Sequence, residues 1–133
     1  LNVTLVPIRL PDRHPLRALL TILEVEAAAA FDDLTRQGVR DGVGNWPPVF
    51  ARGRFVSAVD YLRANRVRTL LLRDMDAVFE KVDLYVGGSD VLLTNLTGHP
   101  TVCLPNGFTK RDGVTVPTAV TMTDRPYDEP SPL

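Results

Sequence analysis

The sequence has a single cysteine and only two lysines, Lys81 and Lys110, among its 133 residues. One cysteine excludes an internal disulfide and also excludes a cysteine-rich metal site. Cys103 lies in the apolar run Thr101-Val102-Cys103-Leu104, which favours a buried structural thiol over a reactive one. A reducing, cytoplasmic setting agrees with so little cysteine.

Long hydrophobic runs and a strong net charge are also missing. No stretch approaches the roughly twenty apolar residues that a membrane helix needs. The start of the chain shows no basic segment followed by an apolar one, so no signal peptide is visible. A net charge of −1 gives no long-range field that would attract nucleic acid or anionic lipid. We therefore expect neither a membrane nor a nucleic acid as partner.

The composition is typical of a soluble globular protein, with 44% apolar and 23% charged residues. A chain of 133 residues is long enough for one compact domain with a core and too short for two ordinary ones. The first residue is Leu1 rather than methionine. We expect from this a processed, trimmed or excised piece of polypeptide.

The N-terminal half predicts helices after a short strand. Residues 1–10 are rich in Val, Leu and Ile, which favours a strand. Residues 16–36 contain no Gly or Pro and are apolar on nearly all sides, which predicts a buried helix ended by Gly38. Residues 41–53 read as a loop because Gly and Pro flank Trp46. From 55 to 79 the apolar positions follow the 3.6-residue period, which predicts a long amphipathic helix.

The C-terminal half predicts strands. Residues 82–86, 101–104 and 114–122 each have the texture of a strand, with a turn at 111–113 between the last two. A short helix is expected near Asn95, with Thr94 or Asn95 as N-cap and Gly98 as its stop. The predicted fold class is α/β, with α+β as the alternative: a small mixed sheet packed with two main helices.

A search for catalytic residues finds little. His14 and His99 each adjoin a proline and lack a partner at the spacing of a zinc site, so surface or capping roles are favoured. Ser89 follows Gly87-Gly88, but no His or Lys stands within several residues to activate it, and a turn is the better interpretation. We expect no metal site, no cofactor and no catalytic residue in this chain.

Several segments together resemble the C-terminal part of amidase-signature enzymes. The run Phe55 to Arg68 is similar to the family's long C-terminal helix, and Val82 to Val86 to the strand after it. Asn95-Leu96-Thr97-Gly98-His99-Pro100 and Pro105-Asn106-Gly107-Phe108 resemble its Asn-Leu-Thr-Gly-x-Pro and Pro-x-Gly-Phe turns. Residues 125–129 resemble its closing Gly-Arg-x-x-x-Glu, although Asp124 stands where Gly is usual. Each motif is weak, and the ordered set is more specific.

The resemblance implies a chemistry that these residues do not supply. Amidase-signature enzymes use a Ser–cis-Ser–Lys triad, in which lysine accepts a proton through the bridging serine while backbone N–H groups hold the oxyanion. Nothing here matches the Gly-Gly-Ser-Ser-Gly stretch that carries the triad. Residues just ahead of Asn95 border the substrate pocket in relatives. Ser89, Asp90 and Asn95 are therefore the candidate pocket residues.

The resemblance also defines the predicted organisation and three functional hypotheses. Residues 1–125 would be a single amidase-like C-terminal domain and 126–133 a proline-rich extended tail. The leading hypothesis is a truncated, catalytically silent domain that self-associates as a homo-oligomer to cover edge and apolar surface. The second is one subunit of a split amidase whose partner chain supplies the triad. The third is a module that binds small amides.

Overall fold

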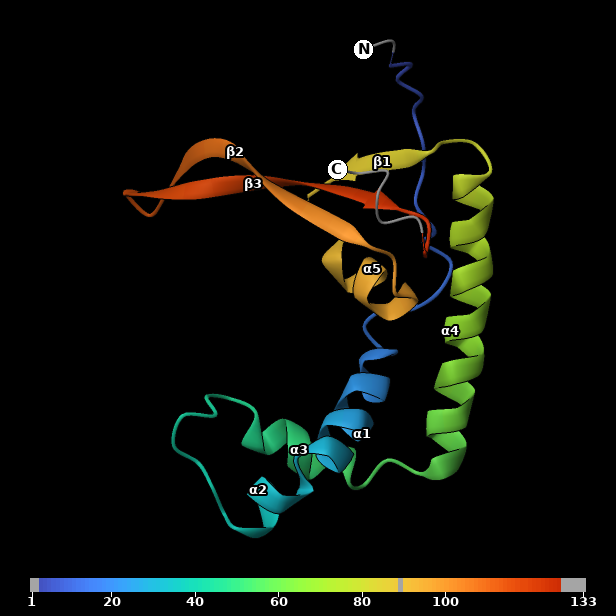
Figure 1. Cartoon of the computed structure of the whole chain (residues 1–133). Helices are drawn as coiled ribbons and strands as arrows, with labels where there is room; N and C mark the ends of the chain where they lie inside the picture. The colour runs from blue at the N-terminus through green and yellow to red at the C-terminus, as the bar shows by residue number, and fades with distance from the viewer. Residues whose placement is uncertain (1–2, 89, 128–133) are drawn as a thin grey trace. The chain divides into compact units, whose positions relative to one another are not determined.

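The computed structural model describes residues 3–88 and 90–127 (Figure 1). These residues fall into two compact units. The helical unit comprises residues 13–70, and the sheet unit comprises residues 1–12 and 71–133 within the described ranges. The helix α4 (Ala58–Phe79) contributes its first part to the helical unit and its last nine residues to the sheet unit. Each unit is described by itself.

The helical unit begins with α1 (Leu20–Ala30) and α2 (Asp32–Arg36). The single helix expected over 16–36 is thus divided at Phe31, whose φ of −110° and ψ of 28° are not helical. Gly38 follows α2 with φ +69°, the left-handed conformation that glycine adopts most readily, and so confirms the predicted stop. Ile22, Ala27 and Ala28 are the buried residues of α1.

The segment that the sequence predicted as a loop contains a helix, α3 (Pro47–Gly53). Pro47 and Pro48 occupy its first turn, where a missing N–H costs nothing because those positions lack an intrahelical acceptor. The expectation of a loop over 41–53 was therefore wrong for its second half. Phe50 anchors α3, with its ring 5.2 Å from that of Phe31 and 5.8 Å from that of Trp46.

The long helix α4 confirms the strongest prediction from the sequence, although it starts later than residue 55. Ser57 precedes it and accepts a hydrogen bond from the backbone N–H of Asp60 at 3.1 Å, as an N-cap does. Its hydroxyl donates to the Asp60 carboxylate at 2.7 Å. The apolar residues of α4 divide between two faces: Leu71, Met75, Val78 and Phe79 are buried, whereas Val59, Leu62 and Leu70 are exposed.

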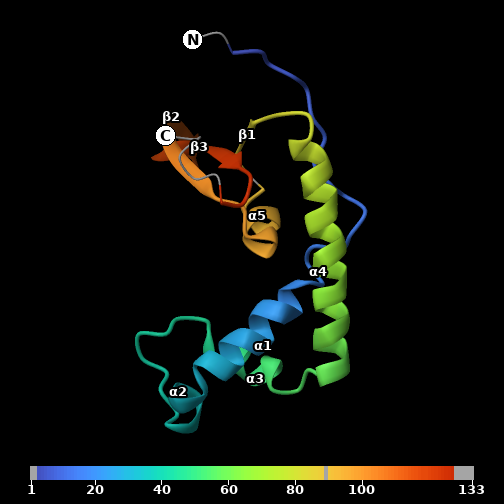
Figure 2. The same ribbon diagram turned by 45° about the vertical axis from the view of Figure 1, so that its right-hand side comes forward.

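The sheet unit contains β1 (Leu84–Gly87), α5 (Val91–Thr97), β2 (Thr101–Arg111) and β3 (Val114–Asp124). The strand order is β1-β3-β2, with β3 antiparallel to both neighbours. Figures 1 and 2 show α5 on one side of this sheet. The predicted class, helices with a small sheet, is confirmed. The sheet is antiparallel in its described pairings rather than mixed, because β1 and β2 both pair with β3 and both run opposite to it.

The β2–β3 hairpin extends beyond β1, and its outer half is uncovered. Asp112 and Gly113 form its turn with φ values of 50° and 82°, the positive values of a two-residue hairpin turn. A register shift between Pro105 and Phe108 interrupts the ladder. Residues 103–115 are exposed on both faces of the ribbon. Cys103 is therefore exposed, and the expectation of a buried thiol was wrong.

Two further predictions concern the ends of the chain. Residues 3–10 form no strand in the described structure, since they make no ladder with β1. Of the predicted tail 126–133, Pro126 and Tyr127 lie within a turn, and residues 128–133 lie outside the described residues.

A close approach of α1 to α3 yields the first testable prediction. A Cβ at Gly53 would clash with the backbone carbonyl of Glu24 and would lie 2.9 Å from the Ala28 Cβ. We expect Gly53→Ala to lower the free energy of unfolding by about 2 kcal/mol, because a backbone group cannot move aside cheaply. Chemical denaturation measures this.

The control for Gly53→Ala is Gly42→Ala. Gly42 has φ +76° and open space around it, so only backbone strain is added, about 1 kcal/mol. An equal or smaller loss at Gly53 would contradict the packing described here.

Candidate functional site

The candidate pocket residues lie at the turn between β1 and α5. The strand β1 ends at Gly87, Gly88 lies in a bend, and Asp90 is the N-cap residue of α5. The predicted N-caps, Thr94 and Asn95, were wrong, because α5 starts at Val91. Gly98 ends the helix in the left-handed conformation, as expected.

Asp90 is held by two intramolecular hydrogen bonds. Its Oδ1 accepts from the backbone N–H of Gly88 at 3.2 Å, and its Oδ2 accepts from the Tyr85 hydroxyl. A Cβ at Gly87 would lie 2.5 Å from Asp90 Oδ1, so the carboxylate needs a glycine beside it. Both carboxylate oxygens therefore serve to close the turn.

Tyr85 supports this turn from the buried face of β1. Burial raises the pKa of its hydroxyl, and the hydrogen bond to Asp90 raises it further, while a hydrogen bond with Thr123 acts in the opposite direction. The phenol consequently keeps its proton at ordinary pH and remains the donor to Asp90. A permanent donor facing a carboxylate fixes structure and does not exchange protons with a substrate near neutral pH.

The other two candidates differ in position. Asn95 lies on α5 with an exposed side chain. Ser89 lies outside the described residues. The structure thus places Asp90 against Tyr85, and it leaves Asn95 one helical turn further along with its amide open to solvent. Sequence reasoning missed Tyr85, whose inward place in the alternation of β1 was the available signal.

A second polar group of residues is buried next to α5. His99 Nδ1 lies 2.7 Å from Thr97 Oγ1, which itself donates to the carbonyl of Leu93 at 2.9 Å. The threonine hydroxyl has one proton, so its hydrogen bond to the Leu93 carbonyl is compatible with His99 Nδ1 as the donor of the pair.

His99 contradicts the surface or capping role expected from the sequence. It is buried and its ring stacks on Phe79, with centroids 5.1 Å apart and an angle of 15°. Its Nε2 has no hydrogen-bond partner among the described residues. Burial lowers the pKa of the imidazole, and the charge of Asp76 only partly opposes this.

The other residues that the structure describes form no catalytic constellation. Within residues 3–88 and 90–127, no group of three His, Cys, Asp or Glu side chains is placed to hold a metal ion. Ser57, the serine of these ranges, is engaged as the cap of α4. A hollow of about 550 Å³ at the end of α4 is lined by Asp76, Phe79, Glu80, Arg125 and Pro126, away from Asp90. No helix in these ranges is both long enough and apolar enough to cross a membrane.

Comparison with known sequences places these motifs in a family. No protein-family model matches the chain. Similar curated proteins are glutamyl-tRNA(Gln) amidotransferase subunits A. That of Chloroflexus aggregans is 34% identical over 92 residues, covering 52% of this chain and 18% of the relative. That of Methanosarcina barkeri is 26% identical over 159 aligned residues, covering 86% of this chain and 33% of the relative. The chain is a distant homologue of the amidase-signature family.

Solved structures show the same fold as part of larger amidase-type chains. One belongs to a vestigial protein complex bearing on the origins of an s-triazine catabolic enzyme, with a TM-score of 0.73, 20% identity, and coverage of 92% of this chain and 33% of that one. Another is an amidase, with a TM-score of 0.64, 20% identity, and coverage of 87% and 32%. The resemblance read from the sequence is confirmed, and this chain spans about a third of the amidase-signature proteins that it matches most fully.

The buried, neutral His99 predicts how stability depends on pH. Its pKa is depressed in the folded state, so the unfolded chain binds a proton more readily. The stabilisation is complete above the ordinary value of 6.5 and is lost as pH falls below it. We expect the free energy of unfolding, measured by denaturant titration, to decrease between pH 8 and pH 5.

Two variants identify the group responsible for that pH dependence. His99→Asn keeps a donor near Thr97 but cannot titrate, and it should flatten the decrease. His14→Gln removes the other histidine of the chain and should leave the decrease intact. The same slope in His99→Asn would show that another group is responsible.

Proposed function

We propose that these 133 residues form an amidase-derived α/β domain that does not hydrolyse amides by itself and that self-associates. One observation supports the lack of hydrolysis. The chain matches about a third of the amidase-type proteins, and its sequence does not contain the Gly-Gly-Ser-Ser-Gly segment. Lys81 and Lys110 are its only lysines, and Lys110 stands near the tip of the exposed hairpin. Ser57 is occupied as a helix cap. The geometry thus supports a structural role.

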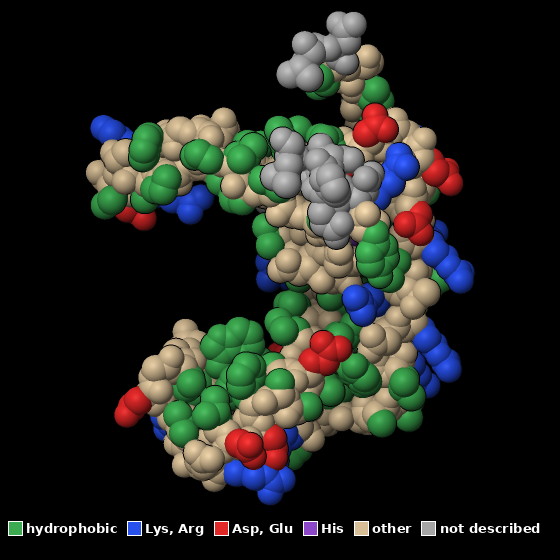
Figure 3. Space-filling model, in the orientation of Figure 1, with side chains coloured by type: hydrophobic (Ala, Val, Ile, Leu, Met, Phe, Trp, Pro, Cys, Tyr) green, Lys and Arg blue, Asp and Glu red, His purple; other side chains and the backbone are tan. Residues whose placement is uncertain are grey.

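Self-association is supported by the uncovered hairpin. An isolated two-stranded ribbon is marginally stable in water, and apolar side chains on it gain free energy when they are covered. Phe108 is 76% exposed, Val114 is 62% exposed and Leu104 is 37% exposed. Figure 3 shows hydrophobic side chains spread along this arm. A second copy of the chain provides the same apolar surface as a cover.

A second candidate function is favoured by the coverage of the relatives. Because the chain spans a third of those proteins, it fits one part of an amidase whose triad is on another polypeptide. In that assembly the turn at Asp90 and the exposed amide of Asn95 would form part of the pocket wall, together with Ser89. The same three positions would carry binding if the domain were a module for small carboxamides.

The catalytic part of the proposal is tested with the purified chain. We expect no release of ammonia from simple carboxamides above the rate without protein, since the serine within residues 3–88 and 90–127 is engaged as a helix cap rather than activated by a base. Hydrolysis that disappears in Ser89→Ala would overturn the proposal. Hydrolysis that appears only after mixing with an amidase segment carrying Gly-Gly-Ser-Ser-Gly would favour the second candidate, and a raised KM in Asn95→Ala would then support the pocket wall.

The self-association part is tested by light scattering over a range of concentrations. We expect a mass above that of the monomer, and a lower mass for Phe108→Asp, because a charge on the arm opposes apolar contact. Gln37→Asp is the matched control, since it adds the same charge at an exposed position of the helical unit, outside the hairpin. A monomer at all concentrations for the unaltered chain would exclude self-association.

A further inference from the structure

The helix α4 has a second apolar stripe that its own unit leaves uncovered. Within the helical unit, Val59 is 56% exposed, Leu62 is 58% exposed and Leu70 is 41% exposed. At 100° per residue these positions, together with Arg63 and Arg66, lie within an arc of about 100° on one side of the helix. We call this set, Val59, Leu62, Arg63, Arg66 and Leu70, the outer stripe. Ala64, on the other side of α4, is buried.

The spacing of the outer stripe fits a helical partner. Positions 59, 62, 66 and 70 are separated by three, four and four residues, spacings that keep the side chains on one face of a helix and so let it pack against another. They span about 16 Å at 1.5 Å per residue, which is three turns of contact. A surface helix usually has one apolar stripe, turned toward the core. The second stripe therefore matches a second packing surface.

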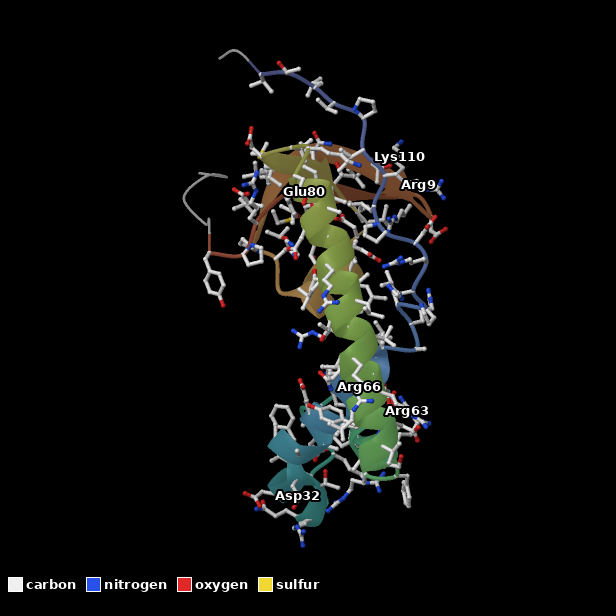
Figure 4. All side chains as sticks on the ribbon, turned by 90° about the vertical axis from the view of Figure 1, so that its right-hand side faces the viewer. Arg9, Asp32, Arg63, Arg66, Glu80 and Lys110 are labelled. Carbon is white, nitrogen blue, oxygen red and sulfur yellow. The ribbon has the colours of Figure 1, made fainter. Side chains whose placement is uncertain are left out.

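The charges of the stripe specify the partner. Arg63 and Arg66 lie close together on α4 (Figure 4), and the side chain of Arg63 is 73% exposed with a single 3.9 Å ion pair to Asp60. Arg66 makes no ion pair with any residue that the structure describes. By contrast, Arg54, which follows α3 in the same unit, forms an ion pair with Asp32 at 2.5 Å. The stripe thus combines aliphatic side chains with two cations available to an incoming carboxylate.

Charge also separates the candidate occupants. Packing the same stripe of a second copy would bring Arg63 and Arg66 against their own equivalents, and like charges repel. Nucleic acid would use the arginines and leave three aliphatic side chains without contact. We propose that the outer stripe of α4 docks an amphipathic helix of another polypeptide, whose apolar row is flanked by Asp or Glu. This interface is independent of the hairpin and of the proposed self-association.

The probe for this interface is a labelled peptide of about three heptads, with Leu at a and d and Glu at e and g. Glutamates at e and g repel one another and keep the peptide from pairing with itself. We expect saturable binding by fluorescence anisotropy, weakened as salt rises. A control peptide with Lys in place of Glu should bind at least about tenfold more weakly, because it meets the arginines with like charge.

Variants of the chain locate the contact. Arg63→Glu with Arg66→Glu should weaken the Glu peptide about tenfold and improve the Lys peptide, the reversal expected of charge complementarity. Leu62→Asp should weaken both peptides. Arg17→Glu with Arg40→Glu makes the same charge change at two exposed positions of the helical unit outside α4 and should have no effect. These positions are exposed, and circular dichroism verifies that each variant keeps its helices.

Four outcomes would overturn the proposal. The first is no binding of the Glu peptide, and the second is equal binding of both peptides. The third is a loss of oligomer mass in Leu62→Asp, which would make a second copy the occupant. The fourth is binding to phosphatidylserine vesicles that is lost in Arg63→Glu with Arg66→Glu while the Glu peptide does not bind. None of these depends on hydrolysis or on Phe108, so this proposal and the proposed function fail separately.

Discussion

Phe79, the last residue of α4, joins three segments of the sheet unit. Its ring lies 5.9 Å from that of Tyr85 on β1 and 5.1 Å from that of His99 after α5. Its carbonyl accepts a hydrogen bond from Arg125 at 2.9 Å, which places a cation at the negative end of the helix. Strand, turn and C-terminal segment are thus all positioned relative to one helix end, and the Asp90 turn is built on that arrangement.

The sheet unit also buries polar side chains of β3, namely Thr121, Thr123 and Asp124. The Thr101 and Thr123 hydroxyls are 3.0 Å apart across β2 and β3, and the backbone N–H of Asp124 donates to Pro100 at 3.1 Å. Three buried atoms, Asp124 Oδ2, Thr121 Oγ1 and His99 Nε2, have no hydrogen-bond partner among the described residues. A buried polar atom without a hydrogen-bond partner costs free energy of folding, so these three atoms lower the stability of the sheet unit.

The sequence was informative where the signal was local and periodic, and uninformative where it depended on distant contacts. The apolar period predicted the helix α4 correctly, and Gly38 and Gly98 predicted two helix ends correctly, because each signal acts within a few residues. The burial of His99 could not be read locally, since it depends on Phe79, twenty positions earlier in the chain. Cys103 was misjudged because an apolar strand gives no sign that both faces of its hairpin are open. Likewise, periodicity placed Leu62 on α4 without showing which face the protein covers.

The free edge of β2 has a consequence for how this protein can assemble. As an outer strand, β2 presents backbone groups that could pair with another chain and extend the sheet without limit. Pro105 lacks the N–H that such a ladder requires, and the register shift beside it bends the strand. Lys110 and Arg111 place charge along the rest of the edge. Strand addition at this edge is therefore opposed, so a partner that meets β2 does so through the side-chain faces of the hairpin rather than through its backbone.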